Sequence, residues 1–311
     1  MRTIKALVLA CFAFCANSLR GQAPDSTTVD IDSAEFTQLI QYYEEAQAMD
    51  SALNYQRGTI GLSDGLATLE LGENYKYLDP EEAQKIIVEA WGNPAQETLG
   101  MILPDSVNPY LYSGWGVIVY YEEDGYIKDE DARSIDYDEL LETMQEEAVE
   151  NNEARRAAGY SGYELKGWAE APYYDMETKK LYWAKELMFD ESEESTLNYD
   201  IRILGRKGFL QMNAVAGISQ LDEVKVSMQD LLSRVEFSQG NTYFDFDPSV
   251  DEVAAYGIGA LVAGKLAAKA GLLKVIGIFF LKFWKILLIA GAGLIAVIRR
   301  VWTGKEQREI T

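Results

Sequence analysis

Histidine is absent from this chain of 311 residues, and cysteine occurs only twice, at Cys11 and Cys15. Without histidine, neither a Ser-His-Asp triad nor a Cys-His pair can form, and no imidazole can bind a transition metal. Both cysteines lie in a short apolar segment near the first residue, so its removal would leave no thiol for a disulfide, a nucleophile or a zinc site. We therefore expect no cofactor and no metal site, and the sequence assigns no catalytic residue.

Positive charge is also scarce, because 28 Lys and Arg residues stand against 50 Asp and Glu residues and give a formal net charge of −22. The acidic excess is concentrated in the middle of the chain, between two more basic ends. Such a field repels nucleic acid and anionic lipid, so nucleic acid is not an expected partner. A divalent cation, a cationic partner or simply a well-hydrated surface are all compatible with it.

Residues 1–21 have the pattern of a secretory signal peptide. Met1 to Lys5 carry positive charge, Ala6 to Ala16 are apolar over the usual length, and small residues follow up to Ala23. The alternatives are a lipid-modified Cys11 or a buried N-terminal helix or strand. Cleavage of this segment would place the rest of the protein outside the cytoplasm.

Residues 251–274 form a segment rich in small residues. Its glycines and alanines recur every four positions and form adjacent stripes on a helix, which include Gly259, Ala263, Gly264, Ala267 and Gly271. Stripes of small residues let a second helix approach closely in a membrane. The expected partner is a second copy of the chain or another membrane protein, and the alternative is a helix packed on its own domain.

Residues 275–302 are predicted to be a membrane-anchor helix. The stretch from Trp284 to Trp302 would span about 27 Å, which is close to the hydrocarbon thickness of a bilayer. A tryptophan then lies at each interface, with charged residues at the two boundaries: Lys282, Lys285, Arg299 and Arg300. We expect a single span in the lipid of the bacterial inner (cytoplasmic) membrane, with the basic and polar tail 303–311 inside. A surface-lying helix or a two-helix hairpin are the alternatives.

Residues 22–57 are expected to form a polar segment and a helix, and residues 58–250 an acidic exported α+β domain. Asp32, Asp79 and Asp136 each precede an apolar pattern of helical period, and a fourth such pattern covers 221–235. Turns predict hairpins over 59–71, 163–189 and 197–215, and a return strand over 126–128. Successive hairpins predict a largely antiparallel sheet with packed amphipathic helices, followed by the C-terminal helical anchor.

Several short strings occur in a defined order: Trp91-Gly-Asn-Pro94, Gly100-Met-Ile-Leu-Pro104, Gly114-Trp-Gly-Val117, Leu181-Tyr-Trp-Ala184, and Leu197-Asn-Tyr199 with Arg202. Through them the chain from about Gly58 onward resembles the DUF2167 family of bacterial membrane-anchored proteins, whose function is unknown. The resemblance implies a signal peptide, an external domain and a membrane anchor, and it transfers no catalytic residue. The strand–turn–strand–helix order over 197–237 is also loosely similar to the Mog1/PsbP class, a likeness of fold only.

Two classes of function remain open. The sequence favours a non-enzymatic, membrane-anchored binding or assembly module outside the cytoplasm, since it lacks nucleophile–base sets and has 19 tyrosines. The alternative is a hydrolase based on carboxylates, which needs two convergent Asp or Glu side chains with pKa values pushed apart. A buried pair of carboxylates in a cleft would favour the enzyme.

Overall fold

The computed structural model describes residues 33–190 and 192–263. The chain divides into two compact units, Met1–Ile258 and Gly259–Thr311, and the description below concerns the first. The predicted signal peptide and the predicted anchor over 275–302 lie outside the described residues. Among the helices of 33–263, none has both the length and the apolar character that a membrane span requires.

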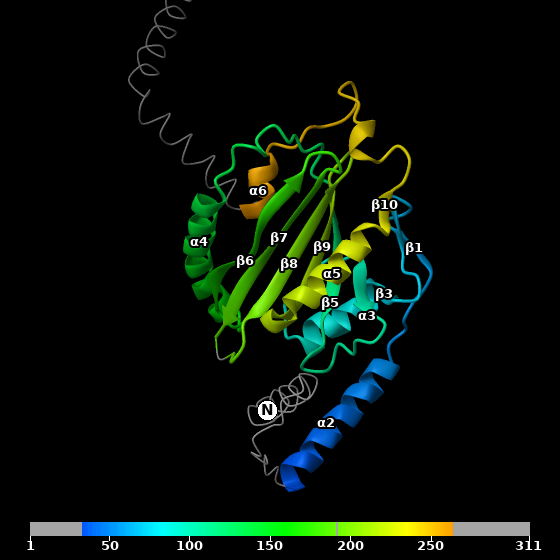
Figure 1. The fold of residues 1–311 in the computed structure, drawn as a ribbon, viewed down its shortest axis with the longest axis vertical. Helices are drawn as coiled ribbons and strands as arrows, with labels where there is room; N and C mark the ends of the chain where they lie inside the picture. Colours follow the sequence, from blue (N-terminus) through cyan, green and yellow to red (C-terminus); the bar gives the residue numbers. More distant parts are fainter. Residues whose placement is uncertain (1–32, 191, 264–311) are drawn as a thin grey trace, which may run out of the picture. The chain divides into compact units, whose positions relative to one another are not determined.

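A seven-stranded antiparallel sheet, in the order β3-β4-β5-β9-β8-β7-β6, forms the centre of the first unit (Figure 1). Its strands are β3 (Tyr75–Leu78), β4 (Gly100–Pro104), β5 (Gly116–Glu122), β6 (Tyr163–Asp175), β7 (Lys180–Phe189), β8 (Thr196–Leu204) and β9 (Phe209–Gly217). A second sheet, in the order β1-β2-β10, contains β1 (Thr59–Leu62), β2 (Ala67–Glu70) and β10 (Val235–Phe237). The predicted hairpins β1–β2, β6–β7 and β8–β9 are confirmed, as is the antiparallel α+β class.

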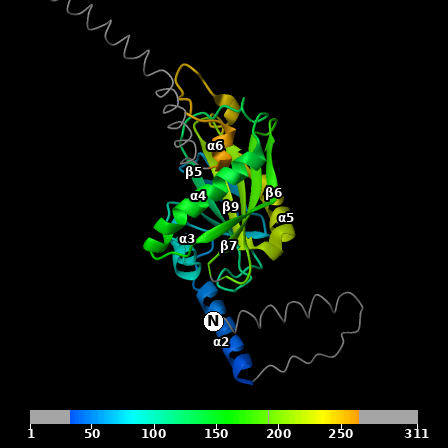
Figure 2. The same ribbon diagram turned by 90° about the vertical axis from the view of Figure 1, so that its left-hand side faces the viewer.

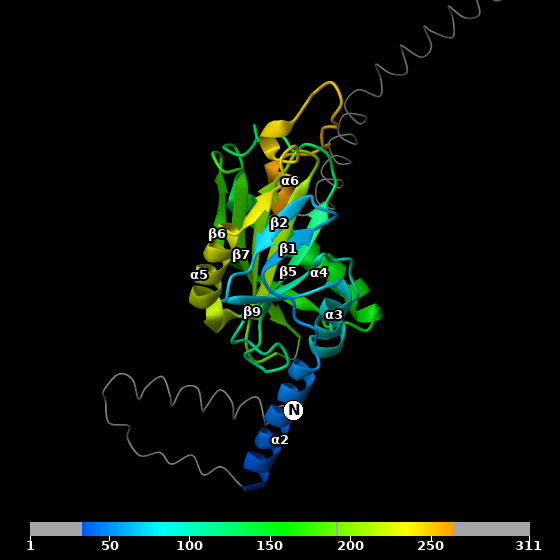
Figure 3. The same cartoon turned by 90° about the vertical axis from the view of Figure 1, so that its right-hand side faces the viewer.

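The main core lies on one face of the large sheet. On β8 this face carries Leu197, Tyr199, Ile201 and Ile203, all buried against the small sheet and α5 (Leu221–Leu232). Figure 3 shows the small sheet in front of β5 and β9. Because a fully buried aliphatic side chain contributes about 1.5–3 kcal/mol, this layer accounts for much of the stability of the fold.

The second face is covered at the β3–β4–β5 end by α3 (Pro80–Gln84) and the π-helical turn η1 (Lys85–Ala90). The prediction for the start of this helix is confirmed, because the Asp79 side chain accepts a hydrogen bond from the Glu82 N–H at 3.0 Å and Pro80 occupies the first turn. Ile86 and Ile87 pack on Met101 beneath them. The helix therefore stacks directly on the end of the sheet.

Helix α4 (Tyr137–Ala157) lies along the edge strand β6 (Figure 2). Its predicted start is confirmed, since Asp136 accepts hydrogen bonds from the N–H groups of Asp138 and Glu139, both at 3.1 Å. Few of its side chains are buried, and they include the polar Asn152 beside Met144 and Ala148. Helix α4 therefore attaches to β6 through hydrogen bonds as well as apolar contacts.

Three sequence predictions need correction. Helix α2 (Ser33–Ser51) forms, but most of its apolar stripe is exposed, with Phe36 at 53% and Tyr43 at 52%. Only its C-terminal half meets the body, through hydrogen bonds such as the one from Asn108 to the Ala46 carbonyl. Residues 126–128 are not a return strand, because β9 already pairs with β5 and Tyr126 bridges only to Val253. The last predicted helix ends at Leu232, and Val235 begins β10.

Candidate functional site

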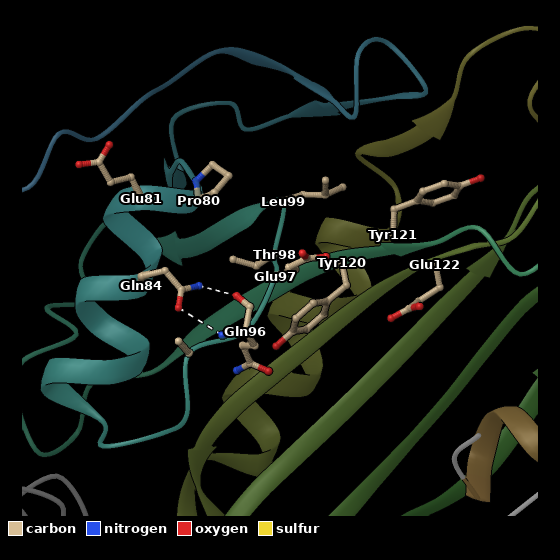
Figure 4. A pocket seen from close by; sticks show the side chains of 11 residues that line it. Pro80, Glu81, Gln84, Gln96, Glu97, Thr98, Leu99, Tyr120, Tyr121 and Glu122 are labelled. Carbon is tan, nitrogen blue, oxygen red and sulfur yellow. Dashed lines mark hydrogen bonds between the residues drawn. The ribbon is translucent and has the colours of Figure 1, made fainter. Parts of the chain in front are cut away.

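An open hollow of about 840 Å³ lies between α3, the segment 95–99 and the end of β5 (Figure 4). Its lining residues are Pro80, Glu81, Gln84, Ala95, Gln96, Glu97, Thr98, Leu99, Tyr120, Tyr121 and Glu122. The Gln84 side chain donates to the Gln96 carbonyl at 2.6 Å and accepts from the Gln96 N–H at 3.3 Å. These two hydrogen bonds fix the loop wall of the hollow to the helix.

The lining of the hollow is acidic and contains no Lys or Arg. Glu81 and Glu97 are exposed and make no ion pair with any residue in the described ranges. Burial raises the pKa of Tyr121 to about 12, and it also raises the pKa of Tyr120, with the Asp200 charge adding to the effect. The two phenols therefore stay neutral and offer aromatic rings, so the hollow is suited to a positively charged group.

A set of polar side chains, which we call the polar row, continues from Tyr120 across the same face of the sheet. The polar row consists of Lys185 on β7, Asn198, Asp200 and Arg202 on β8, and Gln211 and Asn213 on β9. The strand register places Tyr120 opposite Gln211, Gln211 opposite Arg202, and Asn213 opposite Asp200. These residues share a face because side chains on paired positions of neighbouring strands point the same way.

Most of the polar row is internally hydrogen-bonded. Asp200, only 2% exposed, accepts a hydrogen bond from Gln211 Nε2 at 2.8 Å and lies 3.8 Å from Lys185 Nζ. Asn198 Nδ2 donates to Asn213 Oδ1 at 3.1 Å. Burying a carboxylate is costly unless it is paired in this way, so these contacts fix Asp200 in place.

Arg202 is the exception in the polar row. Its guanidinium carbon lies 5.1 Å from the ring centre of Trp183 and 4.9 Å from that of Phe209. The Arg202 Nε and the Trp183 Nε1 are both buried and have no hydrogen-bond partner. Burial lowers the pKa of Arg202, and the nearby carboxylates of Asp200, Glu122 and Asp124 oppose that change.

The carboxyl groups do not show the pairing that a hydrolase needs. Across residues 33–190 and 192–263, every carboxyl whose pKa departs from its ordinary value departs downward; these are Glu82, Asp129, Asp175, Asp245, Asp247 and Asp251. The hydrogen bonds that they accept outweigh the effect of burial. None of these six is a carboxylic acid kept protonated at neutral pH, as a general acid must be. The same ranges contain no group of three side chains suited to hold a metal ion.

The family model described as "Protein of unknown function (DUF2167)" matches residues 54–292. The chain belongs to the DUF2167 family. This confirms the resemblance seen in the sequence, and the hollow, the polar row and Arg202 all lie within the matched part of this DUF2167 protein. No curated protein matches the chain.

Two solved structures are similar to this DUF2167 protein. Cyanobacterial PsbP (CyanoP) from Synechocystis matches with a TM-score of 0.34 and 10% identity, over 60% of this chain and 94% of that one. The Saccharomyces cerevisiae Ran-binding protein Mog1p matches with a TM-score of 0.32 and 10% identity, over 60% of this chain and 96% of that one. At these scores the likeness carries no argument about function.

The structure leaves the residues of the predicted anchor and of the predicted helix contact largely undescribed. Gly259 and Ala263 lie in the short helix α6 (Ile258–Ala263). The others lie outside the described residues: Gly264, Ala267, Gly271, Lys282, Trp284, Lys285, Arg299, Arg300 and Trp302. The polar row and the Arg202–Trp183 contact were not predicted as a site, although Arg202 and Trp183 occur in the strings that carry the family resemblance.

Proposed function

We propose that this DUF2167 protein is a non-catalytic binding or assembly module whose acidic hollow receives a positively charged segment of a partner protein. The observation that carries the proposal is the lining of the hollow, where Glu81, Glu97 and Glu122 occur without a basic side chain. A net charge of −22 on the chain steers cations toward such a recess. Tyr120 and Tyr121 add aromatic rings that favour an ammonium or guanidinium group.

The binding role is favoured over the hydrolase by the state of the carboxyl groups. A hydrolase requires one carboxyl with a raised pKa beside another that stays ionised. Where the described carboxyl groups depart from their ordinary pKa, the change is downward and follows from hydrogen bonds, as at Glu82 and Asp175. Such groups hold charge and geometry, which is what a recognition surface uses.

The location of the module is part of the same proposal. The signal-peptide pattern over 1–21 and the Trp-bounded stretch in 275–302 support export and anchoring by one span of the cytoplasmic membrane, with the domain outside. Full-length protein is expected in the membrane pellet after a high-salt wash. A chain truncated after Ala263 should move to the supernatant, and this end point keeps the hydrogen bond from the Ala254 N–H to the Tyr126 carbonyl. Release of the full-length protein by salt alone would contradict the anchor.

The hollow is tested by removing its charge at constant shape. Full-length protein in detergent is cross-linked in extracts and captured, comparing the native chain with the double variant Glu81→Gln and Glu97→Gln. The matched control is Glu146→Gln with Glu150→Gln, which removes two exposed charges from α4. We expect a partner that salt weakens, that the hollow variant loses and that the control retains. Equal capture by both variants would mean that the hollow is not the binding surface.

A further inference from the structure

Buried polar atoms without a hydrogen-bond partner are rare in the described residues, and two of the three lie at one place. They are Trp183 Nε1 and Arg202 Nε, and the third is Glu82 Oε2, which lies at α3. Native proteins pair nearly all buried donors, so two unpaired donors on neighbouring strands call for an explanation. Both are donors, and therefore the missing group is an acceptor.

The geometry around Arg202 leaves its hydrogen-bonding edge available. The rings of Trp183 and Phe209 flank the guanidinium at 5.1 and 4.9 Å. No hydrogen bond or ion pair joins the guanidinium to another residue of 33–190 or 192–263, although Arg202 is only partly buried. A planar fork of N–H groups held in place by aromatic rings is pre-organised for a planar, two-oxygen acceptor.

We propose that Arg202 and Trp183 form a binding subsite for a single carboxylate group, with two guanidinium N–H groups and the indole N–H as donors. An unpaired charge in this position is costly, and a bound carboxylate would offset that cost. The carboxylates of Asp200, Glu122 and Asp124 lie close enough to act on Arg202, so a doubly charged anion would be repelled more strongly than a single carboxylate. The subsite rests on its own geometry and does not require that the hollow binds a cationic segment.

The subsite can be observed directly at Trp183. The chain has six tryptophans, so full-length protein in detergent with ¹⁵N-labelled indoles gives few N–H signals, and the Trp183→Phe variant identifies the signal of Trp183. Sodium formate is the first probe, with sodium chloride and sodium sulfate at equal ionic strength as references. We expect a saturable shift of the Trp183 signal with formate and none with chloride or sulfate.

Variants of Arg202 test whether the carboxylate binds there. Arg202→Met should abolish the shift, and Arg202→Lys, which keeps the charge but loses the fork, should weaken formate binding by about tenfold or more. Arg57→Met, which breaks only an exposed pair with Asp105, should leave the shift unchanged. The remaining indole signals report whether each variant is folded, and the Arg202→Lys result decides if Arg202→Met does not fold.

The source of the carboxylate is resolved with triglycine and its C-terminal amide. Tighter binding of triglycine than of formate, lost in the amide, would assign the end of a peptide chain, whereas binding of formate alone would assign a small acid. A Trp183 shift that is linear and equal in formate and chloride would overturn the subsite. A formate shift that survives in Arg202→Met would also overturn it, as would an indole N–H that contacts an internal water both with and without formate.

Discussion

The attachment of α4 to the edge of the sheet depends on one side chain, Asn152. Its Nδ2 donates to the Tyr163 carbonyl at 2.8 Å, and its Oδ1 accepts from the Tyr163 N–H at 2.9 Å. The side chain thus pairs with β6 as another strand would, and Asn152 is 8% exposed. Since an edge strand with free N–H and C=O groups invites pairing with other chains, this contact also protects β6. Replacing Asn152 by Ala removes both hydrogen bonds.

The expected cost follows from the two hydrogen bonds and one correction. Each contributes about 0.5–1.5 kcal/mol net, and a buried group of Tyr163 left unpaired adds to the loss, so together they stabilise the fold by about 2–3 kcal/mol. Alanine is the better helix former by about 0.5 kcal/mol, which offsets part of the loss. Asn151→Ala provides the matched control, because Asn151 is the exposed neighbour in the same helix and gains the same propensity. The difference between the two variants therefore isolates the hydrogen bonds.

Thermal unfolding of the full-length protein in detergent measures this difference. For a domain of this size, about 1 kcal/mol shifts the melting temperature by about 2–4 °C, so Asn152→Ala should melt about 4–12 °C below Asn151→Ala. Hydrogen exchange at the Tyr163 amide should accelerate only in the Asn152 variant. If the two variants melt together and the Tyr163 amide exchanges at the same rate in both, the hydrogen bonds do not hold α4 to β6.

Two further predictions concern the ends of the strands. A Cβ on Gly208 would overlap the carbonyl oxygen of Glu122, so Gly208→Ala should destabilise by about 3 kcal/mol or more, whereas Gly61→Ala, with nothing within 4 Å, should change stability by less than about 1 kcal/mol; equal melting temperatures would refute this. Burial alone would raise the pKa of Asp129, but hydrogen bonds from Lys179 and Tyr174 outweigh it and hold the pKa below its ordinary value. Because the folded pKa is the lower one, this contribution is complete above the ordinary value near 4 and is lost as the pH falls through the folded value. Stability curves against pH should show a smaller loss in that acidic window for Lys179→Met, and parallel curves would refute the assignment.

Local signals made much of the fold predictable. The caps at Asp79 and Asp136 work through hydrogen bonds within three residues, and the turn at Asp64–Gly65 uses backbone with positive φ that its sequence favours. Strands β3 and β4 were not predicted, because their residues are buried almost throughout and so show no alternation of apolar and polar side chains. The pairing of β5 with β9 joins residues about ninety positions apart, and no local pattern encodes it.

The candidate site could not be predicted for a related reason. Along β8, Leu197, Tyr199, Ile201 and Ile203 alternate with polar residues, and a period of two normally places the polar residues in solvent. The structure instead buries Asp200 and Asn213 on that second face. Partners for these groups come from other strands, as Gln211 does for Asp200, so whether each is satisfied depends on which strands lie side by side. Only when β7 and β9 flank β8 does it become visible that the amides and Asp200 find partners while Arg202 and Trp183 do not. A face whose purpose was stability alone would have paired these two donors as well, and this contrast within one row of side chains is the reason for assigning them a ligand.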